Sequence, residues 1–212
     1  MSQIASEETL AQAMTHLKLH DPVLGRVINR YGPCKLEPHR NYYQELVDSI
    51  ISQQLSVHAA RAIEQRFRDL FDGHFPTPEE ILTTDVETLR GLGFSRAKGS
   101  YVLDLAQHIV DGKVTFDHLD LLTNEEVIAE LLPVKGIGEW TVHMFLMFCM
   151  GRLDVLPVGD LGIRNGIRKL YNLSEAPSPA EVKEIAEQHH WHPYESVASW
   201  YVWQSLDNKP SL

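Results

Sequence analysis

Helix-start signals recur along the whole chain and constrain its fold more than any other feature. Asp21 followed by Pro22, and Ser95, are each placed to cap a helix. The segments 77–80, 123–126 and 178–181 each begin with Ser or Thr and carry Glu three residues later, which is the pattern of a capping box. No run alternates between apolar and polar residues as a half-buried strand does. The sequence therefore predicts an all-α protein of short helices joined by short turns.

Apolar residues recur with helical periodicity between these signals. A proline after His192 is expected to open the last helix. The predicted helices lie near 3–18, 22–30, 41–52, 56–71, 78–83, 85–91, 96–111, 124–132, 139–150, 160–171, 179–189 and 193–206.

Composition limits the compartment and the partners. Hydrophobic residues make up 43% of the 212 residues, and no apolar run reaches the ~18 residues that a membrane span needs. Cys34 and Cys149 are too few for an iron–sulfur cluster and are expected to be free thiols in a reducing compartment. We therefore expect a protein of the cytoplasm, or of the nucleus in a eukaryote. The net charge of −10 argues against non-specific adhesion to DNA, so a DNA-binding face needs basic groups and helix N-termini concentrated on it.

A glycine turn stands between two predicted helices at 133–139. Gly136 and Gly138 flank Ile137 there, and glycine allows positive φ and the close approach of another backbone. The helix that leaves the turn points unpaired N–H groups back into it, which suits a phosphate. The turn is also explained as an ordinary corner that needs glycine. We interpret it as a seat for one DNA strand.

Asp160 follows Trp140 by twenty residues and directly precedes a predicted helix. Judged from this position alone, Asp160 is a helix cap. A carboxylate held at a helix N-terminus can also act on a nucleotide. His189, His190 and His192 lack the i, i+4 spacing of a helical zinc site, so we place them at a helix end and in a loop.

Several segments together resemble the helix–hairpin–helix (HhH-GPD) DNA glycosylases, most closely the alkylpurine or 3-methyladenine DNA glycosylase II branch. The resemblance spans roughly residues 40 to 206, and the chain looks like the compact form without the N-terminal β domain. It implies two helical lobes with a cleft between them: a bundle at 45–152, and a second lobe built from 1–44 and 153–212. The matching segments are 50–56, 75–78, 92–98, 132–141 and 157–164.

The resemblance implies a catalytic role for Asp160, whose carboxylate would stabilise positive charge on the sugar and orient a water molecule. The related enzymes that also nick the strand carry a lysine where this chain has Trp140, and Lys135 lies five residues earlier. We therefore expect base removal without lyase activity. The aromatic ring of Trp140 is expected to stack on the flipped base.

The same resemblance assigns the other contacts. Trp203 matches a second stacking aromatic, while Met144 and Leu161 stand where the bacterial member has tyrosines, which leaves the range of bases open. Gln54 matches the residue that fills the gap left by the flipped nucleotide, with Leu55 as the alternative. The residues expected to bind phosphate are Gly136, Gly138, Thr141, Ser95, Arg96 and Lys98. The hairpin carbonyls that match a sodium or potassium site of the family are those of Leu132, Val134 and Ile137.

The predicted activity is hydrolysis of the N-glycosidic bond of alkylated purines in duplex DNA, which leaves an abasic site for base excision repair. No cofactor is required, no membrane is involved, and the protein is expected to act as a monomer. Three alternatives remain: a non-catalytic module that binds distorted or damaged DNA, a glycosylase for another damaged base such as oxidised guanine or uracil, and a small-molecule hydrolase.

Overall fold

Twelve α-helices dominate residues 3–206, the part of the chain that the computed structural model describes. The only strand-like pairing in that part is an isolated antiparallel bridge between Ile4 and Arg152. The predicted all-α fold is confirmed. Between residues 3 and 206, no helix is long and apolar enough to cross a membrane.

The helices fall into two compact units. One is the continuous segment Asn41–Phe145, and the other combines the two ends of the chain, up to Arg40 and from Leu146 onwards.

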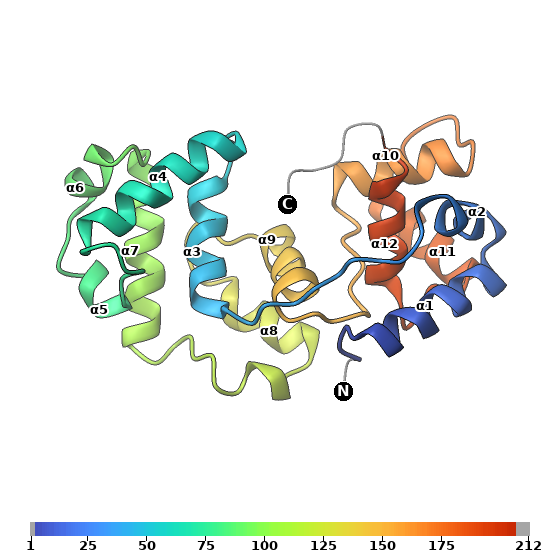
Figure 1. The fold of residues 1–212 in the computed structure, drawn as a ribbon, viewed down its shortest axis with the longest axis horizontal. Coiled ribbons are helices and arrows are strands. Elements are labelled where there is room, and N and C mark those ends of the chain that lie inside the picture. The colour runs from blue at the N-terminus through green and yellow to red at the C-terminus, as the bar shows by residue number, and fades with distance from the viewer. Residues whose placement is uncertain (1–2, 207–212) are drawn as a thin grey trace. The chain divides into compact units, whose positions relative to one another are not determined.

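The central unit is organised around α7. This helix packs against α3, α5 and α6, and α8 packs against α9 (Figure 1). Its core includes Leu46, Phe67, Val102 and Leu105, all fully buried. The elements are α3 (Tyr42–Ser52), α4 (Val57–Leu70), α5 (Pro78–Ile81), α6 (Val86–Gly91), α7 (Arg96–Val110), the short 3-10 helix η1 (Leu119–Leu121), α8 (Asn124–Leu131) and α9 (Glu139–Met144).

The unit formed by the chain ends is organised around α12, which contacts α1, α2 and α10 (Figure 1). Every residue of α12 from Ser196 to Trp203 is buried, so this helix is the centre of the core rather than an amphipathic surface helix. The elements are α1 (Glu7–His20), α2 (Pro22–Tyr31), α10 (Leu161–Leu170), α11 (Pro179–Gln188) and α12 (Glu195–Gln204). The π-helical turn η2 (Phe145–Cys149) follows α9 in the chain.

The capping signals give the helix starts that the sequence predicted. Capping boxes form at Thr77, Thr123 and Ser178, and the side chains of Asp21 and Ser95 accept hydrogen bonds from the first turns of α2 and α7. Local side-chain oxygens satisfy the unpaired N–H groups at these ends, which is why the signals are readable without tertiary information.

Three predicted boundaries are wrong. The first helix begins at Glu7, because Ser6 caps it, rather than near residue 3. The helix predicted to run to residue 150 ends at Met144 and continues as the π turn η2, a difference that apolar periodicity does not register. Pro193 follows a cis peptide bond, and the last helix begins at Glu195 after Tyr194 as its N-cap.

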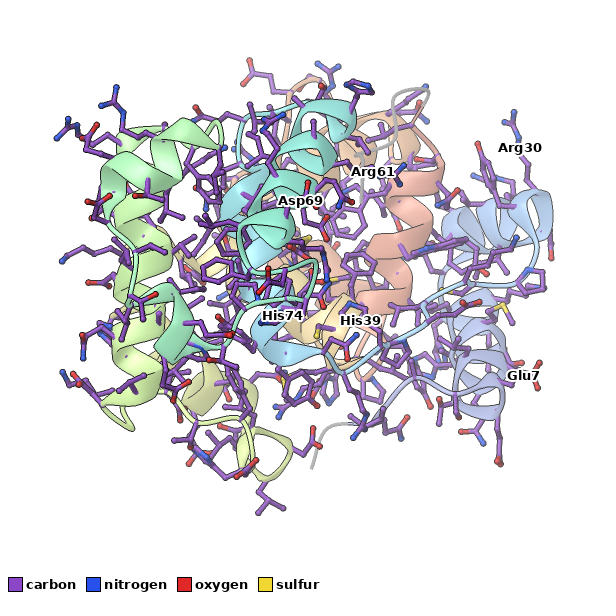
Figure 2. The ribbon with its side chains drawn as sticks, turned by 60° about the vertical axis from the view of Figure 1, so that its left-hand side comes forward. Glu7, Arg30, His39, Arg61, Asp69 and His74 are labelled. Carbon is purple, nitrogen blue, oxygen red and sulfur yellow. The ribbon has the colours of Figure 1, made fainter. Side chains whose placement is uncertain are left out.

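Charge is kept on the outer faces of the helices. Figure 2 shows Glu7 on α1, Arg30 on α2, and Arg61 and Asp69 on α4, all of them exposed. Within residues 3–206, the charged residues that the fold buries are Asp21 and Arg152.

Candidate functional site

Asp160 is the N-cap of α10. Its backbone N–H binds the carbonyl of Pro157 at 2.9 Å, which folds the chain into a turn just before the helix. Its Oδ1 accepts a hydrogen bond of 2.7 Å from the backbone N–H of Ile163. The capping role that the sequence predicted is therefore present. It places the carboxylate at the end of the helix where the dipole favours negative charge.

A second donor fixes the same oxygen. The indole Nε1–H of Trp203, on α12, donates to Oδ1 of Asp160 at 2.9 Å. Because both donors act on one oxygen from different directions, they restrict rotation of the carboxylate. The side chain is half-buried, so water and small groups can still approach it.

Two glycines of α10 make room for this arrangement. A Cβ atom at Gly162 would lie 2.9 Å from Oδ1 of Asp160 and 3.0 Å from Nε1 of Trp203. A Cβ atom at Gly166 would lie 2.5 Å from the side chain of Val202. The missing side chains let α10 approach α12 closely enough for the indole to reach the carboxylate.

The other two residues predicted around Asp160 differ in exposure. The ring of Trp203 is 3% exposed and lies 5.9 Å from the ring of Phe148, whereas Leu161 is 64% exposed. The structure thus gives Trp203 a hydrogen bond to the carboxylate that the sequence did not predict. Stacking of Trp203 on a base, and contact of Leu161 with one, stay predictions.

The glycine turn lies between α8 and α9, as predicted. Gly136 has φ of +84°, and a Cβ atom there would lie 2.2 Å from the ring of Tyr101, so both conformation and space require glycine. Gly138 is the N-cap of α9 and supplies no side-chain hydrogen bond to the first turn. The first N–H groups of α9 therefore have no capping side chain, which is the arrangement that an anion at this end would use.

The predicted residues on α9 differ in exposure. Trp140 is 51% exposed, Met144 is half-buried, and Thr141 is only 8% exposed. The ring of Trp140 is accessible to a ligand. The predicted phosphate contact of Thr141 depends on its backbone N–H more than on its hydroxyl, because the side chain is buried.

The turn between α3 and α4 presents Gln54 and Leu55, the residues predicted to enter the duplex. Gln54 is exposed and has φ of +55°, a left-handed conformation that residues other than glycine adopt at a cost. Leu55 is 40% exposed, and its N–H binds the carbonyl of Ser52 at 3.0 Å. We call residues 53–55 the wedge turn.

Three residues at the start of α7 were predicted to bind phosphate. Ser95 caps the helix by accepting from the N–H of Lys98 at 3.2 Å. Arg96 is 73% exposed in its side chain and pairs with Glu87 at 2.7 Å, an exposed contact worth little energetically. The ammonium of Lys98 instead donates to the carbonyls of Ile51, at 2.8 Å, and Gln53.

Comparison with known proteins identifies the family. The model of the HhH-GPD superfamily base excision DNA repair proteins matches residues 47–190, more than half of the chain. The chain belongs to this superfamily. DNA-3-methyladenine glycosylase 1 of Schizosaccharomyces pombe is 36% identical over 211 residues, which cover 95% of this chain and 92% of the relative.

Two solved structures are similar to most of this chain. The S. pombe 3-methyladenine DNA glycosylase in complex with abasic DNA has a TM-score of 0.78 and 38% identity, covering 91% of this chain and 95% of that one. The DNA-3-methyladenine glycosidase of Bacillus halodurans has a TM-score of 0.82 and 36% identity, covering 91% of this chain and 88% of that one.

The binding of a monovalent cation by the hairpin carbonyls stays a prediction. The Val134 carbonyl accepts from the N–H of Ile137 at 3.1 Å, and a carbonyl oxygen has a second lone pair. Leu132 is 44% exposed and ends α8 as its C-cap. In residues 3–206, no three His, Cys, Asp or Glu side chains form a group that could hold a metal ion. His189, His190 and His192 therefore form no such group either.

Three residues that shape the wedge turn and the glycine turn were not predicted from the sequence: Gln53, Tyr101 and Asp104. The amide Nε2 of Gln53 donates to the carbonyl of Gly136 at 2.8 Å. Asp104 accepts from both the backbone N–H of Lys135, at 2.9 Å, and its ammonium, at 3.0 Å. None of these contacts has a local signal, because the partners lie 31, 35 or 83 residues apart in the chain.

Proposed function

We propose that this protein is a monofunctional DNA glycosylase that removes alkylated purines of the 3-methyladenine class from duplex DNA. Membership of a base excision repair superfamily and the similarity to proteins named 3-methyladenine glycosylases support the DNA substrate and the reaction class. The observation that carries the proposal is the carboxylate of Asp160, fixed by the α10 N-terminus and by the Trp203 indole while still half-buried.

The reaction requires one carboxylate to stabilise a sugar cation and to orient a water molecule. The C1′–N bond breaks, its electron pair leaves with the base, and positive charge develops on the sugar. Asp160 stabilises that charge and orients the water whose oxygen then bonds to C1′, with its proton passing to the carboxylate or to solvent. An alkylated purine already carries positive charge, so its departure needs little help from an acid. One fixed carboxylate is therefore sufficient.

The hairpin supports hydrolysis without strand cleavage. Cleavage through a Schiff base needs a lysine amine, and Trp140 stands at the matching position. The nearby Lys135 is ion-paired with Asp104 at 3.0 Å. We assign the half-exposed ring of Trp140 to stacking on the extruded base, an attraction that a cationic purine strengthens.

The DNA contacts follow from groups that the fold leaves accessible. We assign the first-turn N–H groups of α9 and the side chains of Ser95 and Arg96 to phosphate oxygens. Gln54 at the tip of the wedge turn fills the gap in the duplex. A sodium or potassium ion on the hairpin carbonyls would add positive charge near a phosphate and is not needed for the chemistry.

One assay tests this function. Wild type and Asp160→Asn are incubated with methylated duplex DNA, free bases are identified by chromatography, and abasic sites are measured by alkali cleavage. Wild type should release 3-methyladenine-class bases without nicking the strand before alkali. Damage-selective binding without any base release by wild type would leave a non-catalytic module. The absence of any salt-dependent binding to DNA would leave the small-molecule hydrolase. Strand nicking without alkali would contradict the monofunctional assignment.

A further inference from the structure

Helix α7 touches both of the turns assigned to DNA. Lys98, Tyr101 and Asp104 follow one another at intervals of three residues along it. Lys98 contacts the wedge turn, while Tyr101 and Asp104 contact the glycine hairpin. All of these residues belong to the central unit, so the arrangement is complete within one compact body.

Lys98 completes the end of α3. Its ammonium donates to the carbonyls of Ile51 and Gln53, which lie at the last turn of that helix and have no intrahelical N–H partner. A cation is favourable at a helix C-terminus because the carbonyls carry partial negative charge. The side chain is half-buried, and burial lowers the pKa of Lys98. The ammonium is thus committed to the backbone on both sides of Ser52.

The wedge turn needs such support. Gln54 holds a left-handed backbone conformation, which a residue with a side chain adopts only at a cost in free energy. The flanking residues are fixed instead: Lys98 holds the carbonyl of Gln53, and the side chain of Gln53 binds the carbonyl of Gly136 in the hairpin at 2.8 Å. Gln54 itself remains exposed.

The hairpin side of the link is equally constrained. The Tyr101 ring occupies the space beside Gly136, and Asp104 holds the backbone and the ammonium of Lys135. The wedge turn therefore bonds to a hairpin that cannot shift easily. These contacts fix the position of the wedge turn relative to the hairpin within the central unit.

We propose that Lys98 is a positioning residue that holds the wedge turn in the conformation needed to keep a nucleotide extruded, and that it is not a phosphate ligand. This inference rests on the proposed function, because it assumes that the wedge turn enters DNA. Lys98 acts through the carbonyl of Gln53 and does not touch the substrate. Gln53 passes the constraint to the hairpin.

The salt dependence of binding separates the two roles. The slope of log K against log salt is negative, and removing one phosphate-binding cation makes it less negative by about 0.9 on duplex DNA. Lys98→Met should leave this slope unchanged on undamaged duplex, as should Lys113→Met, an exposed control whose ammonium pairs with Asp111. Arg96→Met, assigned to phosphate, should make the slope less negative. A slope that is less negative by about 0.9 in Lys98→Met would overturn the proposal.

Base extrusion is the second readout. The duplex carries 2-aminopurine beside an abasic analogue, and its fluorescence rises when the wedge turn unstacks it. Lys98→Met should reduce this rise, and should reduce single-turnover base release at saturating protein by about tenfold, the effect of losing a charged hydrogen bond. Lys98→Arg should restore part of both. Unchanged fluorescence in Lys98→Met would also overturn the proposal.

Circular dichroism and the unfolding midpoint show whether Lys98→Met folds. If it does not fold, Gln53→Ala tests the proposal instead. This variant removes the bond to Gly136 without changing any charge, and should reduce the fluorescence rise at an unchanged salt slope. A normal rise in Gln53→Ala would then reject the positioning network. Binding slopes and fluorescence require no catalysis, so they judge Lys98 even if wild type releases no base and the proposed function fails.

Discussion

Two aspartates in the unit formed by the two chain termini cap helices in the same way but differ in their exposure to solvent. Asp21 caps α2 and Asp160 caps α10, and each also accepts a 2.9 Å hydrogen bond from an indole N–H, of Trp191 and Trp203 respectively. Asp21 is fully buried and Asp160 is half-buried. The comparison shows that accessibility separates a structural carboxylate from one that a substrate can reach.

The enclosure of Asp21 explains its role. Its Oδ1 accepts from the N–H groups of Val23 and Leu24, and its Oδ2 accepts from Tyr171 and Trp191. The carboxylate thereby ties the corner between α1 and α2 to the end of α10 and to the segment after α11. A buried charge is tolerated only when it is bonded this completely.

The largest expected effect is the loss of activity in Asp160→Asn. The amide can keep the oxygen that accepts from Ile163 and Trp203, so the cap and the fold should survive. The variant loses the negative charge that we propose stabilises the sugar cation, and single-turnover base release should fall by on the order of 10²-fold or more. Equal release by wild type and variant, at equal unfolding midpoints, would remove Asp160 from the reaction.

Asp21→Asn should show the opposite pattern. An amide nitrogen in place of Oδ2 faces the donors of Tyr171 and Trp191, so buried hydrogen bonds are lost, and we expect about 3 kcal/mol of destabilisation. Chemical denaturation measures this loss. Base release by the protein that remains folded should be close to normal. A variant as stable as wild type would show that the network around Asp21 contributes little.

The comparison also marks how far the sequence can be read. Both aspartates were predicted as helix caps, since capping depends on residues two or three positions away. Their indole donors lie 170 and 43 residues distant, and no local pattern indicates them. Local chemistry therefore predicted most helix starts and the all-α fold. The partners that distinguish Asp21 from Asp160 follow from tertiary packing, which local rules do not describe.

Lys98 gives the same lesson for the wedge turn and the glycine turn. A cation in the first turn of α7 looked unfavourable for that helix, and this favoured a bound phosphate as the explanation. The physical rule holds, but the side chain reaches the C-terminus of α3, where a cation is favourable. The glycine hairpin, in contrast, was predicted in place, because Gly136 and Gly138 act through their own backbone.

The third prediction compares the two indoles directly. Trp203→Phe keeps an aromatic ring and removes the hydrogen bond to Oδ1 of Asp160, so single-turnover base release should fall about tenfold. Trp191→Phe removes the matching bond to Asp21 and should lower stability without slowing release by folded protein. Both variants lose core volume, so the unfolding midpoint serves as the common control. Equal activities in the two variants would contradict a positioning role for Trp203.

Asp48, on α3, shows what happens to a carboxylate with few donors. Its Oδ2 accepts a 3.3 Å bond from Gln44, while its buried Oδ1 has no hydrogen-bond partner in residues 3–206. Burial, aided by the charges of Glu64 and Glu45 and opposed by that of Arg68, raises the pKa of Asp48 to about 7.

The fourth prediction concerns pH. The folded state holds the Asp48 proton more tightly than the unfolded state, whose pKa is near 3.8, so this contribution to stability is lost as pH rises through about 7. Asp48→Asn should be more stable than wild type at pH 8, by on the order of 1 kcal/mol, and the advantage should shrink at pH 5. Denaturation at both pH values measures it. A pH-independent difference would assign the effect to packing instead of titration.

The smallest expected effect compares one glycine in each of the two helices that the aspartates cap. Gly25 on α2 and Gly162 on α10 both gain helix propensity when replaced by alanine. A Cβ at Gly25 would have its nearest neighbour at 3.6 Å, an ordinary contact, so Gly25→Ala should be neutral or stabilise by about 0.5–1 kcal/mol.

A Cβ at Gly162 would lie 2.9 Å from Oδ1 of Asp160 and must displace it or the indole of Trp203. Base release by Gly162→Ala should therefore fall roughly threefold, since the bond between them weakens without being lost. Single-turnover rates of the two variants decide the matter: full activity in Gly162→Ala would mean that the carboxylate tolerates movement, and the close approach of α10 to α12 would then serve packing alone.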